Sequence, residues 1–275
     1  MTSEIPCKEI HSSPKPNGDL IISELQIPEL DLCTVLDSAI CNALSIKKQK
    51  IEEKNSSYYI EYLQSNDIPI VQYSSKLDYD DMMGLIGEII SELHHTHCTK
   101  KEPLYIKWRE TGTSKSKGLD LVFHENDRVY SIECKHPHES LMKIENKKLT
   151  SVVKTINDGL VTHTDERTLE FLARLLKRYL QEKRFLVGSK MNITDVDSKI
   201  KIIENLIEKN NFVSEINIVS DKKYENDLEK NNLDTNLDFK KYEFISQSII
   251  VLLILLENIE KISEEMFTKH DTKQE

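Results

Sequence analysis

The sequence predicts an α/β protein with additional helical elements toward its N-terminal and C-terminal ends. Two runs rich in strand-forming residues, 119–124 and 129–135, are joined by a short polar turn. Elsewhere, apolar residues recur at three- and four-residue steps, which is typical of helices packed on a core. The 275 residues include only 7 Gly and 7 Pro, so regular elements should dominate. This length suffices for one sizeable domain, or for a domain with a smaller lobe.

Residues 1–75 are expected to form an N-terminal α/β lobe with a loose start. The first 20 residues are polar and include Pro14, Pro16 and Gly18. Short apolar runs follow and alternate with one helical stretch, and the Lys/Glu-rich segment 47–55 either extends that helix or follows it. The apolar positions near helical spacing in that stretch are Leu36, Ile40, Leu44 and Ile46.

A second helix is predicted from Asp80 or Asp81 to about His95. Either aspartate can cap it, because a side-chain oxygen there accepts hydrogen bonds from exposed backbone N–H groups. Glu88 and Glu92 lie four residues apart on the flank of its apolar face. The residues that form this face are Met82, Leu85, Ile86, Ile89, Ile90 and Leu93.

The remaining elements are expected to be a strand at 104–108, a loop at 110–118, the hairpin, and then mainly helices. The helices are predicted at 149–160, 165–183, 195–209 and 242–262, with Thr164 and Thr194 as caps of the second and third. Short strands are predicted at 185–187 and 215–219, and a disordered tail at 266–275. The apolar run 249–256 is far shorter than the roughly 20 residues of a membrane span, so we expect a buried helix there.

The hairpin register follows from its turn. If the turn is centred between Asn126 and Asp127, opposed residues have numbers that sum to 253, and Glu133 lies opposite Asp120. Side chains alternate between the two faces of a strand. One face then collects Leu119, Leu121, Phe123, Tyr130, Ile132 and Cys134, and the other collects Asp120, Val122, His124, Ser131, Glu133 and Lys135.

The two opposed carboxylates predict a cation site. Directly opposed Cβ atoms are about 4.5–5.5 Å apart, and like charges repel at that distance. A hard divalent ion between Asp120 and Glu133 would relieve the repulsion, and Mg²⁺ prefers such oxygen ligands (Mn²⁺ is a possible substitute). Lys135 on the same face can hold a phosphate oxygen or help to orient and deprotonate an attacking water.

The charge distribution bears on the substrate. The net charge of −10 argues against a protein that coats nucleic acid nonspecifically. The stretch from residue 100 to residue 118, however, contains six basic and two acidic residues, which gives it a local charge of about +4. The candidate contacts to DNA phosphates in this stretch are Lys107, Arg109, Lys115 and Lys117.

The five cysteines are scattered and include no C-x-x-C pair, so we expect reduced thiols in a cytoplasmic protein. The N-terminus lacks the apolar core of a signal peptide. The segment His94–Cys98 raises the alternative of a zinc site completed by Cys134, His136 and His138. Its spacing is irregular, and a polar helix end is the alternative interpretation.

The order of these features resembles the PD-(D/E)xK restriction-endonuclease-like superfamily. A helix glutamate is followed by G-x-D on one strand and by E-x-K on the next, with Leu119 where the superfamily often has proline. The segments Ile86-Gly-Glu-Ile, Lys117-Gly-Leu-Asp and Ile132-Glu-Cys-Lys are most similar to the HamA family, the nuclease subunits of Hachiman antiphage systems. The resemblance implies a nuclease domain at 76–265, with a mixed sheet whose hairpin carries the site and whose faces carry helices.

The resemblance also implies roles and partners. Asp120 and Glu133 would be metal ligands, Lys135 the catalytic lysine and Glu88 the helix carboxylate that completes the site. The protein would be a Mg²⁺-dependent deoxyribonuclease, the effector of an antiphage complex with a HamB-like superfamily 2 helicase. Two alternatives remain open: a stand-alone restriction or resolvase-type endonuclease, and a non-catalytic DNA-binding subunit of the same fold.

Overall fold

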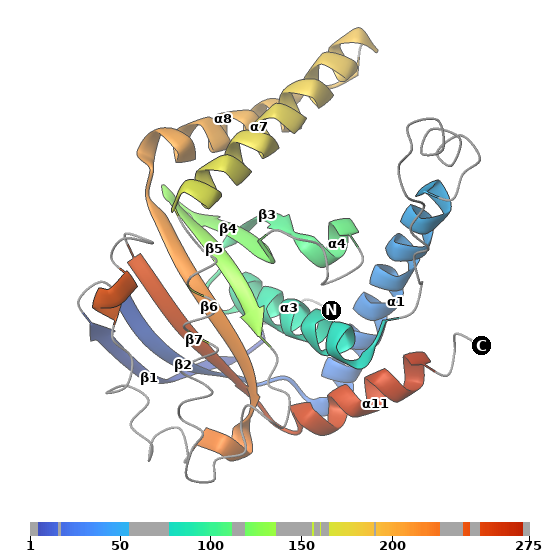
Figure 1. Cartoon of the computed structure of the whole chain (residues 1–275), viewed down its shortest axis with the longest axis vertical. Coiled ribbons are helices and arrows are strands. Elements are labelled where there is room, and N and C mark those ends of the chain that lie inside the picture. The colour runs from blue at the N-terminus through green and yellow to red at the C-terminus, as the bar shows by residue number, and fades with distance from the viewer. Residues whose placement is uncertain are drawn as a thin grey trace, which may run out of the picture.

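The computed structural model describes most of the chain as one α/β assembly around a seven-stranded sheet (Figure 1). The residues described are 5–15, 18–54, 77–111, 119–135, 156, 160, 165–189, 191–225, 239–242 and 248–271. The strands are β1 (Cys7–Lys15), β2 (Gly18–Leu25), β3 (Glu102–Ile106), β4 (Leu121–Glu125), β5 (Arg128–Lys135), β6 (Phe212–Asp221) and β7 (Ser248–Leu256). The helices are α1 (Glu29–Lys54), α3 (Tyr79–His97), α4 (Lys107–Thr111), α7 (Asp165–Gly188), α8 (Thr194–Lys209) and α11 (Ile259–Asp271), with 3₁₀ turns at Lys222–Tyr224 and Phe239–Tyr242.

The sheet is mixed, as predicted. Its order is β1-β2-β7-β6-β5-β4-β3, in which β2, β7, β6 and β5 pair in parallel and the other neighbours pair antiparallel. All ten residues of the central strand β6 are buried. In the β4–β5 hairpin, Leu121 pairs with Ile132 and Glu125 pairs with Arg128, which confirms the predicted register. Asn126 adopts the left-handed conformation in its turn, with φ of 55°.

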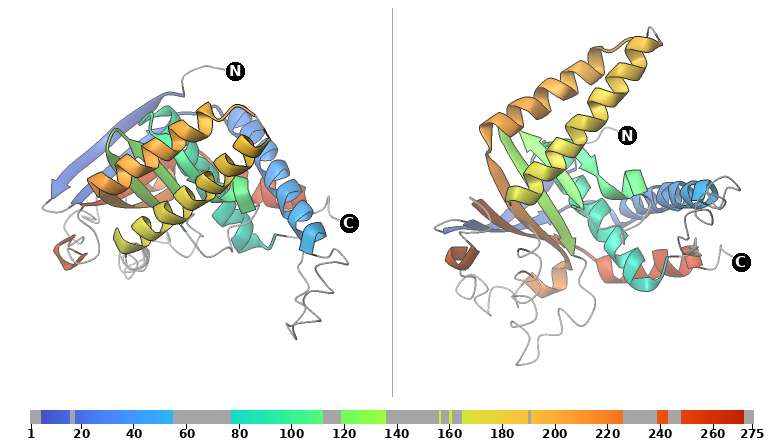
Figure 2. Two further views of the ribbon diagram at one scale, coloured as in Figure 1. Left: turned by 90° about the horizontal axis from the view of Figure 1, so that it is seen from above. Right: turned by 45° about the horizontal axis from the view of Figure 1, so that its top comes forward.

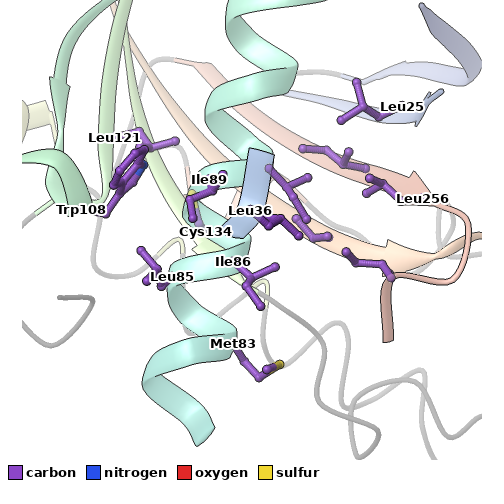
Figure 3. Close-up of a cluster of buried hydrophobic side chains, with 14 of the residues drawn as sticks. Leu25, Leu36, Met83, Leu85, Ile86, Ile89, Trp108, Leu121, Cys134 and Leu256 are labelled. Atoms are coloured by element: carbon purple, nitrogen blue, oxygen red, sulfur yellow. The ribbon is translucent and has the colours of Figure 1, made fainter. Parts of the chain in front are cut away.

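Helices α1, α3 and α11 pack on one face of the sheet and enclose the largest apolar core. Figure 3 shows this cluster, with Leu85, Ile86 and Ile89 of α3 lying against the sheet near Leu121 and Cys134. The opposite face is covered over β2, β6 and β7 by a second cluster that includes the fully buried Ile156 and Leu160. Helices α7 and α8 form a pair that extends beyond the sheet (Figure 2) and encloses a third cluster with Leu119, Val122, Val129 and Phe212.

The hairpin face that carries Asp120, Ser131, Glu133 and Lys135 is therefore largely covered, although Glu133 and Lys135 stay partly exposed. Ser131 is fully buried, and its hydroxyl lies 2.5 Å from the hydroxyl of Thr168 on α7. Leu119 was expected on the same hairpin face as Leu121 and Phe123, which packs on α3 in the structure. It precedes β4 and instead packs with Val122 in the cluster under α7 and α8.

The N-terminal segment differs from the prediction. Residues 7–15 and 18–25, expected in part to be loose, form the β1–β2 hairpin at the edge of the sheet. β2 pairs with β7, and α1 shares its core with α3 and α11. These elements are therefore continuous with the rest of the fold and do not form the separate lobe that we expected at residues 1–75.

The C-terminal segment also differs. The helix predicted at 242–262 is wrong, because the apolar run lies in β7 and a helix begins only at Ile259. Since β7 is covered on both faces, it shows a continuous apolar run without alternation, as buried parallel strands do. α11 continues to Asp271, into the segment expected to be disordered. The strand predicted at 185–187 is likewise wrong, because these residues form the end of α7.

Two further observations concern the pairing of the cysteines and the presence of membrane-spanning helices. A disulfide joins Cys7 of β1 to Cys98 at the end of α3, with Cα atoms 5.7 Å apart, so the expectation of five reduced thiols is wrong for this pair. Cys33, Cys41 and Cys134 are free thiols. Among the helices that the structure describes, none has both the length and the apolar character needed to cross a membrane.

Candidate active site

Helix α3 places the first carboxylate of the site. The helix begins after Asp78, whose side chain accepts a hydrogen bond of 2.9 Å from the backbone N–H of Asp81. The cap is therefore Asp78, two or three residues before the predicted one. The apolar face of α3 packs on the sheet and holds Glu88 at its flank with only 2% of its surface exposed. Glu88 Oε2 is buried and makes no hydrogen bond to any residue that the structure describes.

The hairpin supplies the other predicted residues. Asp120 lies directly before β4, and its Oδ2 accepts a hydrogen bond of 2.9 Å from the backbone N–H of Cys134 on β5. The neighbours of Cys134 in the chain are Glu133 and Lys135, and the Lys135 Nζ lies 2.6 Å from Glu133 Oε1. The register thus brings Asp120, Glu133 and Lys135 together at one end of the hairpin, as the sequence predicted.

Lys107 is the residue whose role was misjudged from the sequence. It was expected to contact DNA, but it is buried at the start of α4 with 4% of its surface exposed. Its Nζ lies 2.5 Å from Asp120 Oδ1 and 3.4 Å from Glu88 Oε1. The ammonium group therefore lies among the carboxylates, in the region where a divalent ion was expected. The local sequence shows a basic residue at this position but gives no signal that it is buried.

The carboxylates are destabilised as charged groups. Burial raises the pKa of Glu88 well above its ordinary value, the Asp120 carboxylate raises it further, and Lys107 acts in the opposite direction. Burial also raises the pKa of Asp120, as does the Glu133 carboxylate, against the lowering effect of Lys107. Burial and the repulsion between neighbouring carboxylates therefore both favour the protonated forms of Glu88 and Asp120.

Lys135 is held as a cation. Burial alone would lower the pKa of its amine, but the Glu133 carboxylate outweighs burial and raises it above the ordinary lysine value. A protonated lysine can donate hydrogen bonds to an anion but cannot accept a proton. This favours phosphate binding by Lys135 over direct deprotonation of water, the two roles that the sequence left open.

The residues that follow Lys107 attach the short helix α4 to both α3 and α7. The indole of Trp108 donates a 3.0 Å hydrogen bond to Glu92 of α3, and Arg109 forms an ion pair with the same carboxylate. Glu110 accepts a 2.7 Å hydrogen bond from Arg178 of α7. Arg109, another expected DNA contact, is therefore ion-paired with Glu92. The remaining two, Lys115 and Lys117, lie outside the described residues.

The histidine segment of α3 does not assemble into the zinc site that was considered. The His94 Nε2 lies 3.0 Å from the hydroxyl of Ser23, and the His95 Nε2 lies 2.8 Å from Glu215 Oε1. Burial lowers the pKa of His94 to about 3 and also lowers that of His95, so both rings are neutral. Lys101 faces Glu215 at 3.3 Å and supplies the cation of this buried cluster, which lines a cavity of about 240 Å³.

Two of the other proposed zinc ligands, Cys98 and Cys134, lie in other surroundings. Cys98 is engaged in the disulfide with Cys7. Cys134 is buried under α3, where burial raises the pKa of its thiol well above the ordinary value. His136 and His138 lie outside the described residues.

Glu88, Asp120 and Glu133 offer the oxygen ligands that a hard divalent cation prefers, with the ammonium group of Lys107 now lying between Glu88 and Asp120. Glu88 comes from α3, Asp120 from the residue before β4 and Glu133 from β5. Burial, and after it their mutual repulsion, raises the pKa values of Glu88 and Asp120, and Glu88 Oε2 is a buried acceptor without a hydrogen bond in the described structure. No family model matches the chain, and no curated protein or solved structure does either.

The raised pKa of Glu88 predicts a pH-dependent stability. Between the ordinary value of 4.5 and the raised value, the folded state binds more protons than the unfolded state. The stabilisation is complete below the ordinary value and is lost as pH rises through the folded pKa. In metal-free buffer, the free energy of unfolding of Glu88→Gln should therefore increase relative to that of the wild type as pH rises from about 5 to about 8. Between the unfolded and folded pKa values of Glu88, the expected increase is about 1.4 kcal/mol per pH unit.

Denaturant unfolding at several pH values measures this difference. Glu110→Gln is the matched control, because Glu110 pairs with Arg178 outside the carboxylate cluster. A stability difference between Glu88→Gln and the wild type that does not change with pH would contradict the assignment of a raised pKa to Glu88.

Proposed function

We propose that the protein is a metal-dependent DNA nuclease that hydrolyses phosphodiester bonds. The observation that carries this proposal is the convergence of Glu88, Asp120 and Glu133 with the protonated Lys135 at the end of the β4–β5 hairpin. Three carboxylates and a lysine match the chemical requirements of phosphoryl-group chemistry, in which cations must neutralise the charge that develops on the phosphate. A binding module would gain nothing from buried carboxylates that repel each other.

Glu88, Asp120 and Glu133 would hold Mg²⁺ or Mn²⁺. When bound, such an ion polarises the phosphodiester and lowers the pKa of a coordinated water. The Cys134 N–H holds the Asp120 carboxylate, and the packing of α3 sets the position of Glu88, so the backbone positions of both ligands are determined by the fold. Lys135 binds a phosphate oxygen with its ammonium group, while Glu133 keeps that group charged and positioned.

Lys107 sets the conditions under which the site can bind a cation. Its ammonium group already neutralises part of the charge on Asp120 and Glu88. A divalent ion bound between these carboxylates must displace or compete with it, because two cations would otherwise repel across a buried, low-dielectric site. The metal affinity of the free chain is then lower than its three carboxylates alone would give.

A partner would help this acidic chain to reach DNA. The net charge of −10 gives no long-range attraction to a polyanion, and two of the four expected DNA contacts are engaged with carboxylates. Together with the HamA resemblance, this supports the proposal that the chain is the effector subunit of an antiphage complex with a superfamily 2 helicase.

The nuclease proposal predicts that Glu133→Ala and Lys135→Ala each lower DNA cleavage by at least about 100-fold, the order expected when a group that stabilises the transition state is removed. Plasmid cleavage in Mg²⁺ or Mn²⁺ measures this for the chain with its partner present. Both residues are partly exposed, so circular dichroism should show an unchanged fold. Lys199→Ala, which removes an exposed lysine paired with Asp195 on α8, is the control. Cleavage at the wild-type rate by both site variants would refute the proposed site.

Lys107→Met should increase the affinity for Mn²⁺ by about tenfold, because a competing cation is removed, whereas Asp120→Asn should abolish binding. Isothermal titration calorimetry on the isolated chain measures both affinities. Arg109→Met removes the neighbouring cation of α4, which pairs with Glu92 and not with Asp120, and should leave the affinity close to that of the wild type. Weaker binding by Lys107→Met would show that Lys107 supports the metal site.

The proposed complex predicts co-purification. A tagged chain expressed with its neighbouring genes should retain a superfamily 2 helicase through size-exclusion chromatography, and sequencing those genes identifies it. The Lys135→Ala variant should retain the helicase equally well, because the active site need not contribute to the interface. The absence of any helicase gene beside this one would favour a stand-alone endonuclease.

A further inference from the structure

The first and last helices of the described structure bring three unlike metal ligands together, far along the chain from the candidate active site. One ligand atom each from Asp37, Cys41 and His270 lies within 4.8 Å of the other two. We propose that these residues form a second metal site, specific for Zn²⁺ or a similar borderline transition-metal ion, that links α1 to α11. This inference does not depend on the proposed nuclease function.

The fold positions these ligands through regular secondary structure. Asp37 and Cys41 are four residues apart on α1, so their side chains project from the same face of that helix. His270 lies in the last turn of α11, which packs beside α1 (Figure 1). Its ring is 2% exposed, whereas Cys41 is exposed and Asp37 is partly exposed. The site is thus open to an ion from solvent on one side and supported by the helix packing on the other.

The chemical types of the three ligands indicate which class of metal ion this site would bind. A thiolate, an imidazole and a carboxylate together are typical ligands of Zn²⁺, whereas Mg²⁺ and Ca²⁺ prefer oxygen alone. Three protein ligands leave a fourth tetrahedral position for water. The metal that we expect here therefore differs from the one proposed for the carboxylates of the active site.

The present contacts are compatible with metal binding. Asp37 Oδ1 lies 2.9 Å from His270 Nε2 and 2.8 Å from Lys269 Nζ. The aspartate and histidine are thus already oriented toward each other. Lys269 is a long side chain with 41% exposure, so it can move into solvent when a cation takes its place. On binding, the Cys41 thiol loses its proton to solvent and forms the S–Zn bond, while neutral His270 donates its ring nitrogen lone pair.

Co²⁺ substitution on the full chain tests this proposal, because a cobalt–thiolate bond gives a charge-transfer absorption band that oxygen ligands do not give. The wild type should show this band and lose it when Zn²⁺ is added. Cys41→Ser should abolish the band, and His270→Gln should weaken Co²⁺ binding by at least about tenfold, as expected for the loss of a ligand. Zn²⁺ should also raise the thermal unfolding temperature of the wild type but not that of Cys41→Ser.

Two controls separate this site from other cysteines and from the active site. Cys33→Ser changes a free cysteine on the same helix that is not part of the ligand group, and it should keep the band. Asp120→Asn removes a central carboxylate of the nuclease site and should also keep it, so failure of the nuclease proposal leaves this result unchanged. Absence of the band in the wild type, or its persistence in Cys41→Ser, would overturn the proposal. Because Cys41 is exposed, its replacement should not disturb the core.

Discussion

The burial of two carboxylates around one ammonium group is the constraint on which the candidate site depends. Glu88 and Asp120 come from a helix and from the start of a strand, and Lys107 lies between them. Separating any one of the three would leave a buried charge without its partner, which typically costs several kcal/mol. Helix α3, helix α4 and the β4–β5 hairpin are therefore held in one relative position, and the positions of Glu133 and Lys135 follow from the hairpin pairing.

The hairpin and α3 were predictable because their signals are local. A two-residue turn fixes the register of a hairpin, so the proximity of Asp120 and Glu133 follows from numbering alone. The apolar face of α3 repeats at helical steps, which locates Glu88 on its flank. The burial of a side chain depends on tertiary packing and not on its local sequence. For this reason Lys107 was predicted to contact DNA although it is buried in the protein. It lies between Ile106 and Trp108 in a stretch with an excess of basic residues, and only the packing of α4 against α3 shows that its amine faces carboxylates.

The errors at the two chain ends have a common physical cause. β2 and β7 pair with each other although more than 200 residues separate them, and no pattern within either segment predicts that pairing. An apolar run such as β7, buried on both faces, lacks the alternation that identifies a strand and also fits a buried helix. The polar β1 lies at the sheet edge, where one side needs no partner, and it therefore resembles a loop.

The position of α4 connects the chemistry of the site to the rest of the molecule. Lys107 begins α4, Trp108 and Arg109 bond to Glu92 of α3, and Glu110 bonds to Arg178 of α7. The Glu110–Arg178 contact thus joins α4 to α7, which extends away from the sheet together with α8. Lys107 thus lies on an element that contacts both the core and the projecting helices. In the proposed metal site, the cation affinity of the carboxylates would therefore depend on the position of α4 as well as on the carboxylates themselves.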